Sequence, residues 1–397
     1  MAHKDLSKAK NGKNDEFYTQ YHDIEKEMSA YLEFNPKAFK GKIVLLPCDD
    51  PEWSNFTKFF AQNFERFGLK KLISTSYAVE SKNYNSNYQP TLFEVNDPQF
   101  DETKTRINGK IFTLTRDKSG DGKIDVNDLE WTYLKGDGDF RSDEIKKLRD
   151  KSDIIITNPP FSLFREFLAW IIEAKKQFML IGNINVITYK EVFPLIKENK
   201  VWLGTGMGRW ISGFVVPDSY ELYGTEAGID KSGNRIVATN NCLWLTNIDH
   251  GKRHQPLNLM TTEDNLRYNK KLKGIDSYKK YDNYDAIEVP FTDAIPSDFK
   301  GVMGVPITFL DKYNPEQFDI LGATQRGCHD EVPDTVKYDD YWEVKQNGQK
   351  TGSSGGKTNE NANLVGNDGK KNYFINKNGK VIQSAYQRIF IKHKKTI

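Results

Sequence analysis

One tetrapeptide, Asn158-Pro159-Pro160-Phe161, combines residue types that could act on the amino group of a substrate. It follows the apolar run at residues 153–157, which is typical of a buried strand, and it precedes Ser162, which can cap a helix. The two prolines stiffen the loop and leave its carbonyls without local N–H partners. The side-chain oxygen of Asn158 and the carbonyl of Pro159 can therefore both accept hydrogen bonds from one amino group.

This arrangement suits methyl transfer to an exocyclic amine such as N6 of adenine, whose lone pair is delocalised into the ring. Two acceptors that hold both amine protons would draw the nitrogen toward tetrahedral geometry and free that lone pair. A sulfonium methyl donor is already activated, so alignment and preorganised dipoles suffice without a metal. The ring of Phe161 offers a face on which a base that has left its duplex can stack. The alternative is an ordinary strand-to-helix turn, since Asn-Pro is common in turns.

Strands and helices alternate on both sides of this loop. Residues 42–48 are typical of a buried parallel strand, residues 53–67 carry aromatics at helical spacing, and residues 69–75 suit a second strand. Further strands are expected at residues 153–157, 178–182 and 201–203. The alternation predicts an α/β fold with a doubly wound, mostly parallel sheet. The tetrapeptide then lies at the carboxyl edge of the sheet, where such folds bind ligands.

Two segments depart from this alternation. Residues of about 103–135 suit a hairpin insertion, whose turn at residues 117–128 is similar to a calcium loop of the EF-hand type. The twelfth position of that loop is Asp128 instead of a longer Glu, and its flanks suit strands. A plain hairpin turn is therefore favoured, with a weak cation site as the alternative. Residues 347–372 are rich in Gly, Asn, Lys and Ser, which predicts a flexible loop.

The composition excludes several classes of protein. With 37% hydrophobic and 13% aromatic residues, the 397-residue chain can form a packed core. Its three cysteines are far apart, which argues against a disulfide framework or a zinc knuckle and favours a reducing compartment. No apolar run approaches the roughly 18 residues that a membrane helix needs, and no signal peptide is evident. The six histidines show no metal-ligand spacing. We expect a cytoplasmic protein with no membrane partner and no metal.

The sequence resembles the adenine-specific DNA methyltransferases, whose fourth motif has the form [DNS]-P-P-[YFW], and more narrowly the EcoRI modification methylase family. The similarity rests on residues 13–19, 46–50, 54–56, 135–142 and 157–164. It implies a bacterial or phage-encoded enzyme with a Rossmann-like fold and S-adenosylmethionine as cofactor. It also implies methylation of N6 of a flipped adenine in double-stranded DNA, with a cognate restriction endonuclease as a candidate partner.

The resemblance also implies which residues bind the cofactor. The segment Phe17-Tyr18-Thr19 matches the motif beside the methionine part of the cofactor, and Pro47-Cys48-Asp49 replaces the usual glycine-rich loop. Asp139 would accept a hydrogen bond from the cofactor's adenine, next to Phe140. Two features depart from the family pattern of such enzymes: the FxGxG loop is absent, and the second strand ends without an evident acid for the ribose. Glu80 is the candidate for that acid.

We expect a catalytic domain at residues 1–250 and a target-recognition region at residues 251–397. Five basic residues are predicted to contact DNA: Arg209, Lys270, Lys271, Lys273 and Arg388. Two alternatives have the same loop, namely a methyltransferase for RNA adenine or protein glutamine, and a non-catalytic DNA-binding protein with a methyltransferase-like fold. Phenylalanine at position 161 and the basic, aromatic C-terminal region favour DNA, and the intact Asn158 loop favours catalysis.

Overall fold

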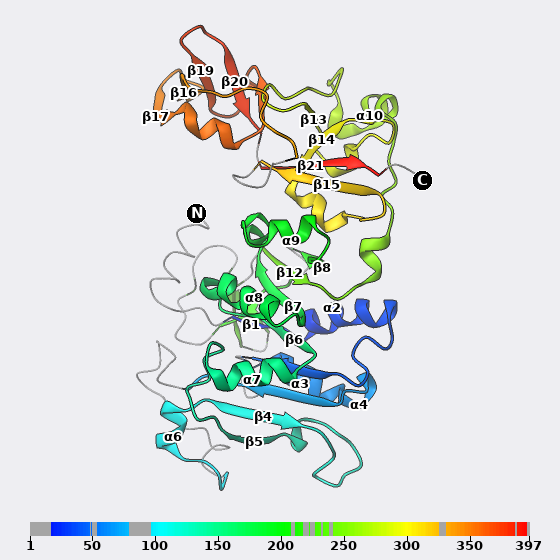
Figure 1. Ribbon diagram of the computed structural model, residues 1–397, viewed down its shortest axis with the longest axis vertical. Coiled ribbons are helices and arrows are strands. Elements are labelled where there is room, and N and C mark those ends of the chain that lie inside the picture. The colour runs from blue at the N-terminus through cyan, green and yellow to red at the C-terminus, as the bar shows by residue number, and fades with distance from the viewer. Residues whose placement is uncertain are drawn as a thin grey trace. The chain divides into compact units, whose positions relative to one another are not determined.

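The computed structural model describes residues 17–47, 49, 54–78, 97–207, 211–216, 222, 227–231, 233–237, 241–324, 331–385 and 387–394. The chain forms two compact units (Figure 1). The first comprises Met1–Val186 and Trp202–Gly251, and the second comprises Ile187–Val201 and Lys252–Ile397. Within the described part of the chain, no helix has the length and apolar character needed to cross a membrane.

The first unit contains an eight-stranded sheet in the order β5-β4-β3-β2-β6-β7-β12-β8. Its four central strands are parallel: β3 (Lys71–Thr75), β2 (Ile43–Leu46), β6 (Ile154–Thr157) and β7 (Gln177–Asn183). These short, buried and largely apolar runs match the strands expected from the sequence. The α/β class predicted from the alternation is confirmed.

Both sides of the sheet are antiparallel. On one side, β4 (Lys110–Leu114) and β5 (Glu130–Tyr133) form the expected hairpin and extend β3. On the other side, β12 (Cys242–Thr246) runs antiparallel between β7 and β8 (Trp202–Met207). The prediction of a mostly parallel sheet is therefore correct only for the four central strands. The connection between β4 and β5 contains no crossover helix, so the two strands pair antiparallel as a hairpin.

Helices pack on both faces of this sheet. On one face, α2 (Tyr21–Phe34), α3 (Asn55–Gln62) and α4 (Phe64–Phe67) share a buried core with alternate strand residues such as Val44, Ile156 and Trp244. The intervening strand residues point to the other face because the side-chain period of a strand is two. There α7 (Asp143–Lys151) contacts β2, and α8 (Phe164–Glu173) contacts β7. A short helix, α6 (Glu102–Ile107), precedes the hairpin.

The hairpin turn at residues 117–128 is held by its own carboxylates. Asp128 accepts hydrogen bonds from the backbone N–H groups of Asp125, Ser119 and Lys118, and these bonds lower its pKa to about 2. Asp117 similarly accepts from the N–H groups of Gly120 and Gly122. Across the described residues, no group of three or more His, Cys, Asp or Glu side chains is placed to hold a metal ion.

The N-terminal strand belongs to a small second sheet of the first unit. Its order is β1-β9-β11-β10, with antiparallel pairing throughout. The strands are β1 (Tyr18–Thr19), β9 (Phe214–Val215), β10 (Ala227–Ile229) and β11 (Arg235–Val237). Helix α2 links both sheets, because Asp23 accepts from Ser212 while Glu27 accepts from the backbone of Thr205 and Gly206.

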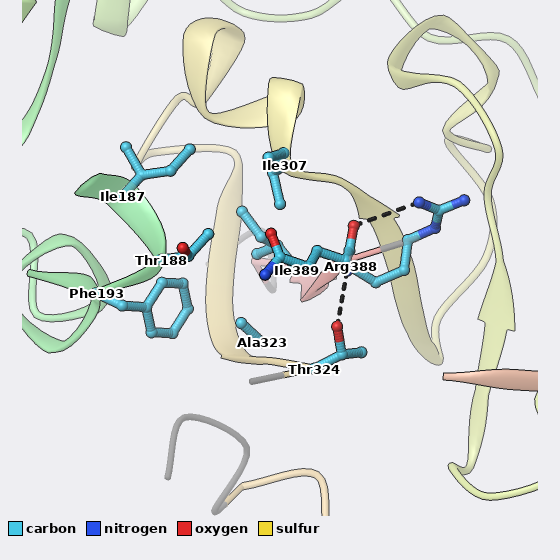
Figure 2. Close-up of a pocket in the computed structure, with 9 residues that line it drawn as sticks. Ile187, Thr188, Phe193, Ile307, Ala323, Thr324, Arg388 and Ile389 are labelled. Atoms are coloured by element: carbon cyan, nitrogen blue, oxygen red, sulfur yellow. Dashed lines mark hydrogen bonds between the residues drawn. The ribbon is translucent and has the colours of Figure 1, made fainter. Parts of the chain in front are cut away.

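The second unit has a four-stranded sheet in the order β13-β14-β21-β15. The strands are β13 (Ala286–Glu288), β14 (Val302–Pro306), β15 (Phe318–Ala323) and the C-terminal β21 (Arg388–His393), whose strand was expected from its alternation. Residues 187–201, which were expected to belong to the catalytic domain, lie in this unit. Their helix α9 (Phe193–Lys197) contacts β15, and Phe193 lines an apolar pocket with Ala323 and Ile389 (Figure 2). Helix α10 (Thr262–Tyr268) precedes this sheet in the chain.

A five-stranded antiparallel sheet, β17-β16-β19-β20-β18, completes the second unit. Its strands are β16 (Tyr341–Val344), β17 (Lys350–Ser354), β18 (Asn363–Val365), β19 (Tyr373–Asn376) and β20 (Val381–Ser384). The prediction of a flexible loop at residues 347–372 is therefore wrong, because these residues contain β17 and β18. The polar residues occupy turns and solvent-facing strand positions, while Tyr338, Tyr341, Phe374 and Ile382 form a small core.

Replacement of Gly204 by alanine should destabilise the first unit. A Cβ atom at this β8 position would collide with the Glu27 carboxylate and lie 2.6 Å from Cβ of Trp244. Overpacking of this kind typically costs about 1–3 kcal/mol, which chemical denaturation would measure. Gly228→Ala is the matched control, since nothing lies within 4 Å of its added methyl group. Equal stability of both variants would show that α2 does not press against β8 in this way.

Candidate active site

The carboxyl ends of β2, β3 and β6 are joined by hydrogen bonds. The Thr157 hydroxyl, at the end of β6, donates to the Pro47 carbonyl at 2.9 Å. The backbone N–H of Asp49 donates to the carbonyl of Thr75, at the end of β3, at 2.8 Å. The predicted loop at residues 47–49 and the predicted catalytic loop therefore meet at one edge of the sheet. This is the edge at which parallel sheets bind ligands.

The amide of Asn158 has a fixed orientation. Its Nδ2 donates to the backbone carbonyl of Phe17 at 2.7 Å, and only the NH₂ end of an amide can donate to a carbonyl. The Oδ1 atom is buried and has no hydrogen-bond partner among the described residues. Most buried acceptors in proteins are hydrogen-bonded, so an unfilled one marks a candidate ligand position. The two prolines that follow contribute no backbone donor to fill it.

Phe161 belongs to a cluster of three aromatic rings. Phe17 stacks on it with ring centroids 5.5 Å apart and planes 21° apart, and Phe214 meets it edge-on at 6.2 Å. Phe17 and Phe214 also contact each other at 5.9 Å. One face of Phe161 is therefore covered by Phe17, and stacking of a flipped base on Phe161 stays a prediction. Phe17 thus both orients Asn158 and supports Phe161.

The segment predicted to lie beside the cofactor is held against the catalytic loop. Tyr18 and Thr19 pair with β9, and Asn55 of α3 donates to the Thr19 carbonyl at 2.8 Å. The hydroxyl of Thr19 is buried and has no hydrogen-bond partner in the described part of the chain. It is a second unfilled polar atom, two residues from the carbonyl that orients Asn158.

Asp139 lies on the loop between β5 and α7, which packs against the chain that leaves the end of β3. The N–H of Ala78 donates to the Asp137 carbonyl at 2.8 Å, and Gly138, with φ of 91°, packs so closely on Ser76 that a Cβ atom would collide with its carbonyl. Burial raises the pKa of Asp139, but hydrogen bonds and charge from Arg141 outweigh it, so the net pKa lies below its usual value. The guanidinium Nε donates to Asp139 at 2.9 Å.

Phe140 does not lie open beside Asp139. Its ring is 1% exposed and packs on Phe167 and Trp170 of α8, with centroids 5.0 and 5.6 Å away. The ring anchors the Asp139 loop on α8, so direct contact of Phe140 with the cofactor would require a rearrangement. Asp139, by contrast, is reachable, since its side chain is 22% exposed.

Comparison with known proteins identifies the family. The model of the family described as adenine-specific methyltransferase EcoRI matches residues 5–394. The chain belongs to this family. The methyltransferase is 51% identical over 316 residues to the type II methyltransferase M.EcoRI of Escherichia coli. The aligned region covers 80% of this chain and 88% of M.EcoRI.

Two further relatives come from mycoplasmas. The type II methyltransferases M.MpnI of Mycoplasma pneumoniae and M.MgeORF184P of Mycoplasma genitalium are 33% and 35% identical to this chain. Each alignment covers 80% of this chain, with 84% and 85% of the respective relative. No solved structure matches the chain. The family predicted from the motifs is confirmed.

The residues predicted to contact DNA have different surroundings. Lys270, Lys271 and Lys273 are exposed, but Lys271 forms a 2.7 Å ion pair with Asp293. Arg388 is mostly buried, and its Nε donates to Glu288 at 2.9 Å. This placement favours a structural role for Arg388, since a phosphate would have to displace a buried partner. Arg209, Cys48 and Glu80 lie outside the described residues.

Three residues of the site were not identified from the sequence. Asn55 lies in a segment that carries the family resemblance, but its bond to Thr19 depends on the pairing of β1 with β9. Phe214 reaches the site through the same pairing, which joins β9 to a strand almost 200 residues earlier in the chain. Arg141 is only two residues from Asp139 in the chain, and this close spacing of an arginine and an aspartate could have predicted their ion pair.

Thr157→Val should destabilise the methyltransferase, because it removes the bond that joins the ends of β6 and β2. Valine has nearly the same shape as threonine, so the loss of stability would come from the Pro47 carbonyl, which stays buried without this donor. We expect about 1–3 kcal/mol in the free energy of unfolding. Thr157→Ser keeps the hydroxyl and serves as the control. If valine proved as stable as serine, the hydrogen bond would not hold these loops together.

Proposed function

We propose that this methyltransferase transfers a methyl group from S-adenosylmethionine to N6 of an adenine at a specific sequence in double-stranded DNA. The observation that carries the proposal is the buried Oδ1 of Asn158, an acceptor that no described residue fills. Its orientation is set by the hydrogen bond from Nδ2 to Phe17. A preset acceptor answers the main difficulty of the reaction, which is the weak nucleophilicity of an amino group conjugated with its ring. Adenine is the base named by the family.

The residues around the loop fit S-adenosylmethionine, which when bound supplies a methyl group on a positively charged sulfur. The buried Thr19 hydroxyl lacks a partner among the described residues and suits a polar group of the methionine part. The Asp139 carboxylate, kept ionised by Arg141, suits the adenine amino group. Pro47 and Asp49 would line the site through their backbone. Residues 74–78, at the end of β3, include no acid for the ribose hydroxyls, so that contact would come from elsewhere.

The catalytic loop would act by holding the N6 group. Asn158 Oδ1 and the Pro159 carbonyl would each accept a hydrogen bond from one N–H of the amine, which leaves the nitrogen lone pair available for in-line attack on the methyl group. The bond from that methyl group to sulfur would break as the new bond to nitrogen forms, and the methylated nitrogen would release one proton to solvent. Because Phe17 already fixes the amide, little reorganisation is needed when the base arrives. The adenine must leave the duplex to reach the buried oxygen, and the aromatic cluster offers apolar surface for it.

The strand order supports a Rossmann-like methyltransferase fold for the first unit, with β12 inserted antiparallel before β8. We assign residues 1–250 to catalysis, except for residues 187–201, which belong to the second unit, and residues 251–397 to recognition of the target DNA, with Lys270 and Lys273 as candidate phosphate contacts. The enzyme would act in the cytoplasm of a bacterium, or of a phage-infected one, with a restriction endonuclease as a candidate partner.

Labelled methyl transfer from S-adenosylmethionine to unmethylated duplex DNA, followed by nucleoside analysis, tests the proposal. Label in N6-methyladenine is the expected result. Label in RNA or in a protein glutamine, with none in DNA, would keep the role of the catalytic loop and refute the substrate. Cofactor binding without transfer to DNA containing all short sequences would indicate a non-catalytic DNA-binding protein.

Asn158→Ala should slow methylation strongly while the fold and cofactor affinity persist. The substitution removes the preset acceptor, and loss of one such group costs about 10²–10³ in kcat. Single-turnover methyl transfer would measure the rate, and calorimetry would measure cofactor binding as the control. A variant as fast as the wild type would eliminate Asn158 from the mechanism.

Asp139→Ala should weaken cofactor binding before it affects the rate at saturation. A hydrogen bond to a charged group contributes about 1.5–3 kcal/mol, so the Kd should rise about tenfold or more. Arg141→Gln is the informative partner, because it retains the carboxylate and removes only the group that orients it. Unchanged affinity in Asp139→Ala would refute the assignment of this carboxylate to the cofactor.

A further inference from the structure

Two adjacent turns of the five-stranded sheet carry an unusual set of side chains. They comprise residues 345–350, from the end of β16 to the first residue of β17, and residues 366–372, between β18 and β19, and are called the lysine tip below. Their thirteen residues are four lysines, five carboxamides, three glycines and one acid. The lysines are Lys345, Lys350, Lys370 and Lys371, and all four are exposed. The tip thus has a formal charge of +3 and no apolar side chain.

The four tip lysines lie close together and form no salt bridge within the described part of the chain. By contrast, Lys380, at the opposite end of the same sheet, pairs with Asp282 at 2.8 Å. Lys345 only approaches the Gln349 amide at 3.5 Å, and Lys350 lies 4.2 Å above the Trp342 ring.

The one acid of the tip, Asp368, is engaged by neutral donors. Its carboxylate accepts from the side chain of Gln383 and from the backbone N–H of Lys370, and these bonds lower its pKa. The nearby charge of Lys371 also lowers the pKa of Asp368, although the two side chains form no salt bridge, so Asp368 stays ionised and offsets one of the four positive charges. The positive charge of the tip is left for an external anion.

The tip is built on an ordered framework. Gln346 and Asn367 exchange hydrogen bonds of 3.0 and 3.3 Å, which joins the two turns side by side. Val344 pairs with Tyr373 directly below them, and Phe374 lies in the core of the sheet. The ammonium groups therefore extend from fixed backbone positions, so less conformational freedom is lost on binding than for lysines on a disordered segment.

We propose that the lysine tip contacts the phosphate backbone of the target duplex; this inference rests on the proposed function. Unpaired lysines are typical phosphate contacts, and each neutralised phosphate releases a counterion. The carboxamides can add hydrogen bonds to phosphates or base edges. The tip fits a DNA contact better than Lys271 or Arg388, since those two cations already have carboxylate partners.

The test replaces the four tip lysines by glutamine in the full-length enzyme. The matched control replaces Lys37, Lys40, Lys147 and Lys151, which are also exposed and form no salt bridge among the described residues. Three of these lie just before β2 or β6, at the amino ends of the parallel strands, so the control has the same change in charge away from the active-site edge. Thermal unfolding would establish that both variants are folded, and a Lys→Arg variant of the tip should behave like the wild type.

Binding of a fluorescent unmethylated duplex would be followed over a series of salt concentrations. The slope of log K against log salt should fall by about 0.9 for each phosphate that the variant no longer neutralises, and thus by about 3 to 4 for the tip variant. The control should retain nearly the wild-type slope. Methyl transfer at saturating DNA and cofactor affinity should be unchanged in the tip variant, because neither depends on these side chains.

The outcomes separate the two proposals. A wild type that methylates DNA, together with a tip variant whose slope equals that of the control, would overturn the role of the tip alone. An equal or larger change of slope with single-stranded RNA would overturn its assignment to duplex DNA. A wild type that neither binds nor methylates any DNA would overturn the proposed function, and the inference with it.

Discussion

The hydrogen bond from Asn158 Nδ2 to the Phe17 carbonyl is the interaction on which the site depends. It joins residues 141 positions apart in the chain and determines which end of the Asn158 amide remains available. Without this bond, the amide could rotate and present a donor where the substrate also offers a donor. A buried acceptor without a partner costs about 1–3 kcal/mol, so the surrounding structure must hold the amide in place. Substrate binding would recover that free energy.

Helix α2 provides much of this support. Its apolar residues Ile24 and Met28 belong to the core on the sheet, while its buried acid Glu27 binds the backbone of β8 and Asp23 binds the backbone just before β9. Burial raises the pKa of Glu27, although donors from Thr205 and Gly206 lower it in part. A carboxylate in this position is tolerated only because backbone N–H groups satisfy it. The same helix thus positions β8 and the strand that carries Phe214, and through β9 it positions Phe17.

Local patterns in the sequence were sufficient for the elements that carry chemistry. The run at residues 153–157, the two prolines and the hairpin at 111–134 have signatures within a few residues, and the structure has strands and turns there. What depended on distant pairing was not predicted. The antiparallel β12, the ring of Phe214 and the order of residues 347–372 all depend on partners far along the chain. A polar, glycine-rich composition describes a loop and the turns of an antiparallel sheet equally well.

Which charged residues form ion pairs also could not in general be predicted from local sequence. A cluster of basic residues in a sequence does not reveal which cations the fold pairs with acids. Glu288 is 100 positions from Arg388 and yet forms a buried ion pair with it, whereas the lysines at 370 and 371 follow Asp368 closely and form no salt bridge with it. The formal charge of +2 over the whole chain is therefore compatible with a local excess of positive charge. For a protein that binds a polyanion, the informative quantity is the number of cations that the fold leaves without a carboxylate, because only these release counterions at no cost in broken ion pairs.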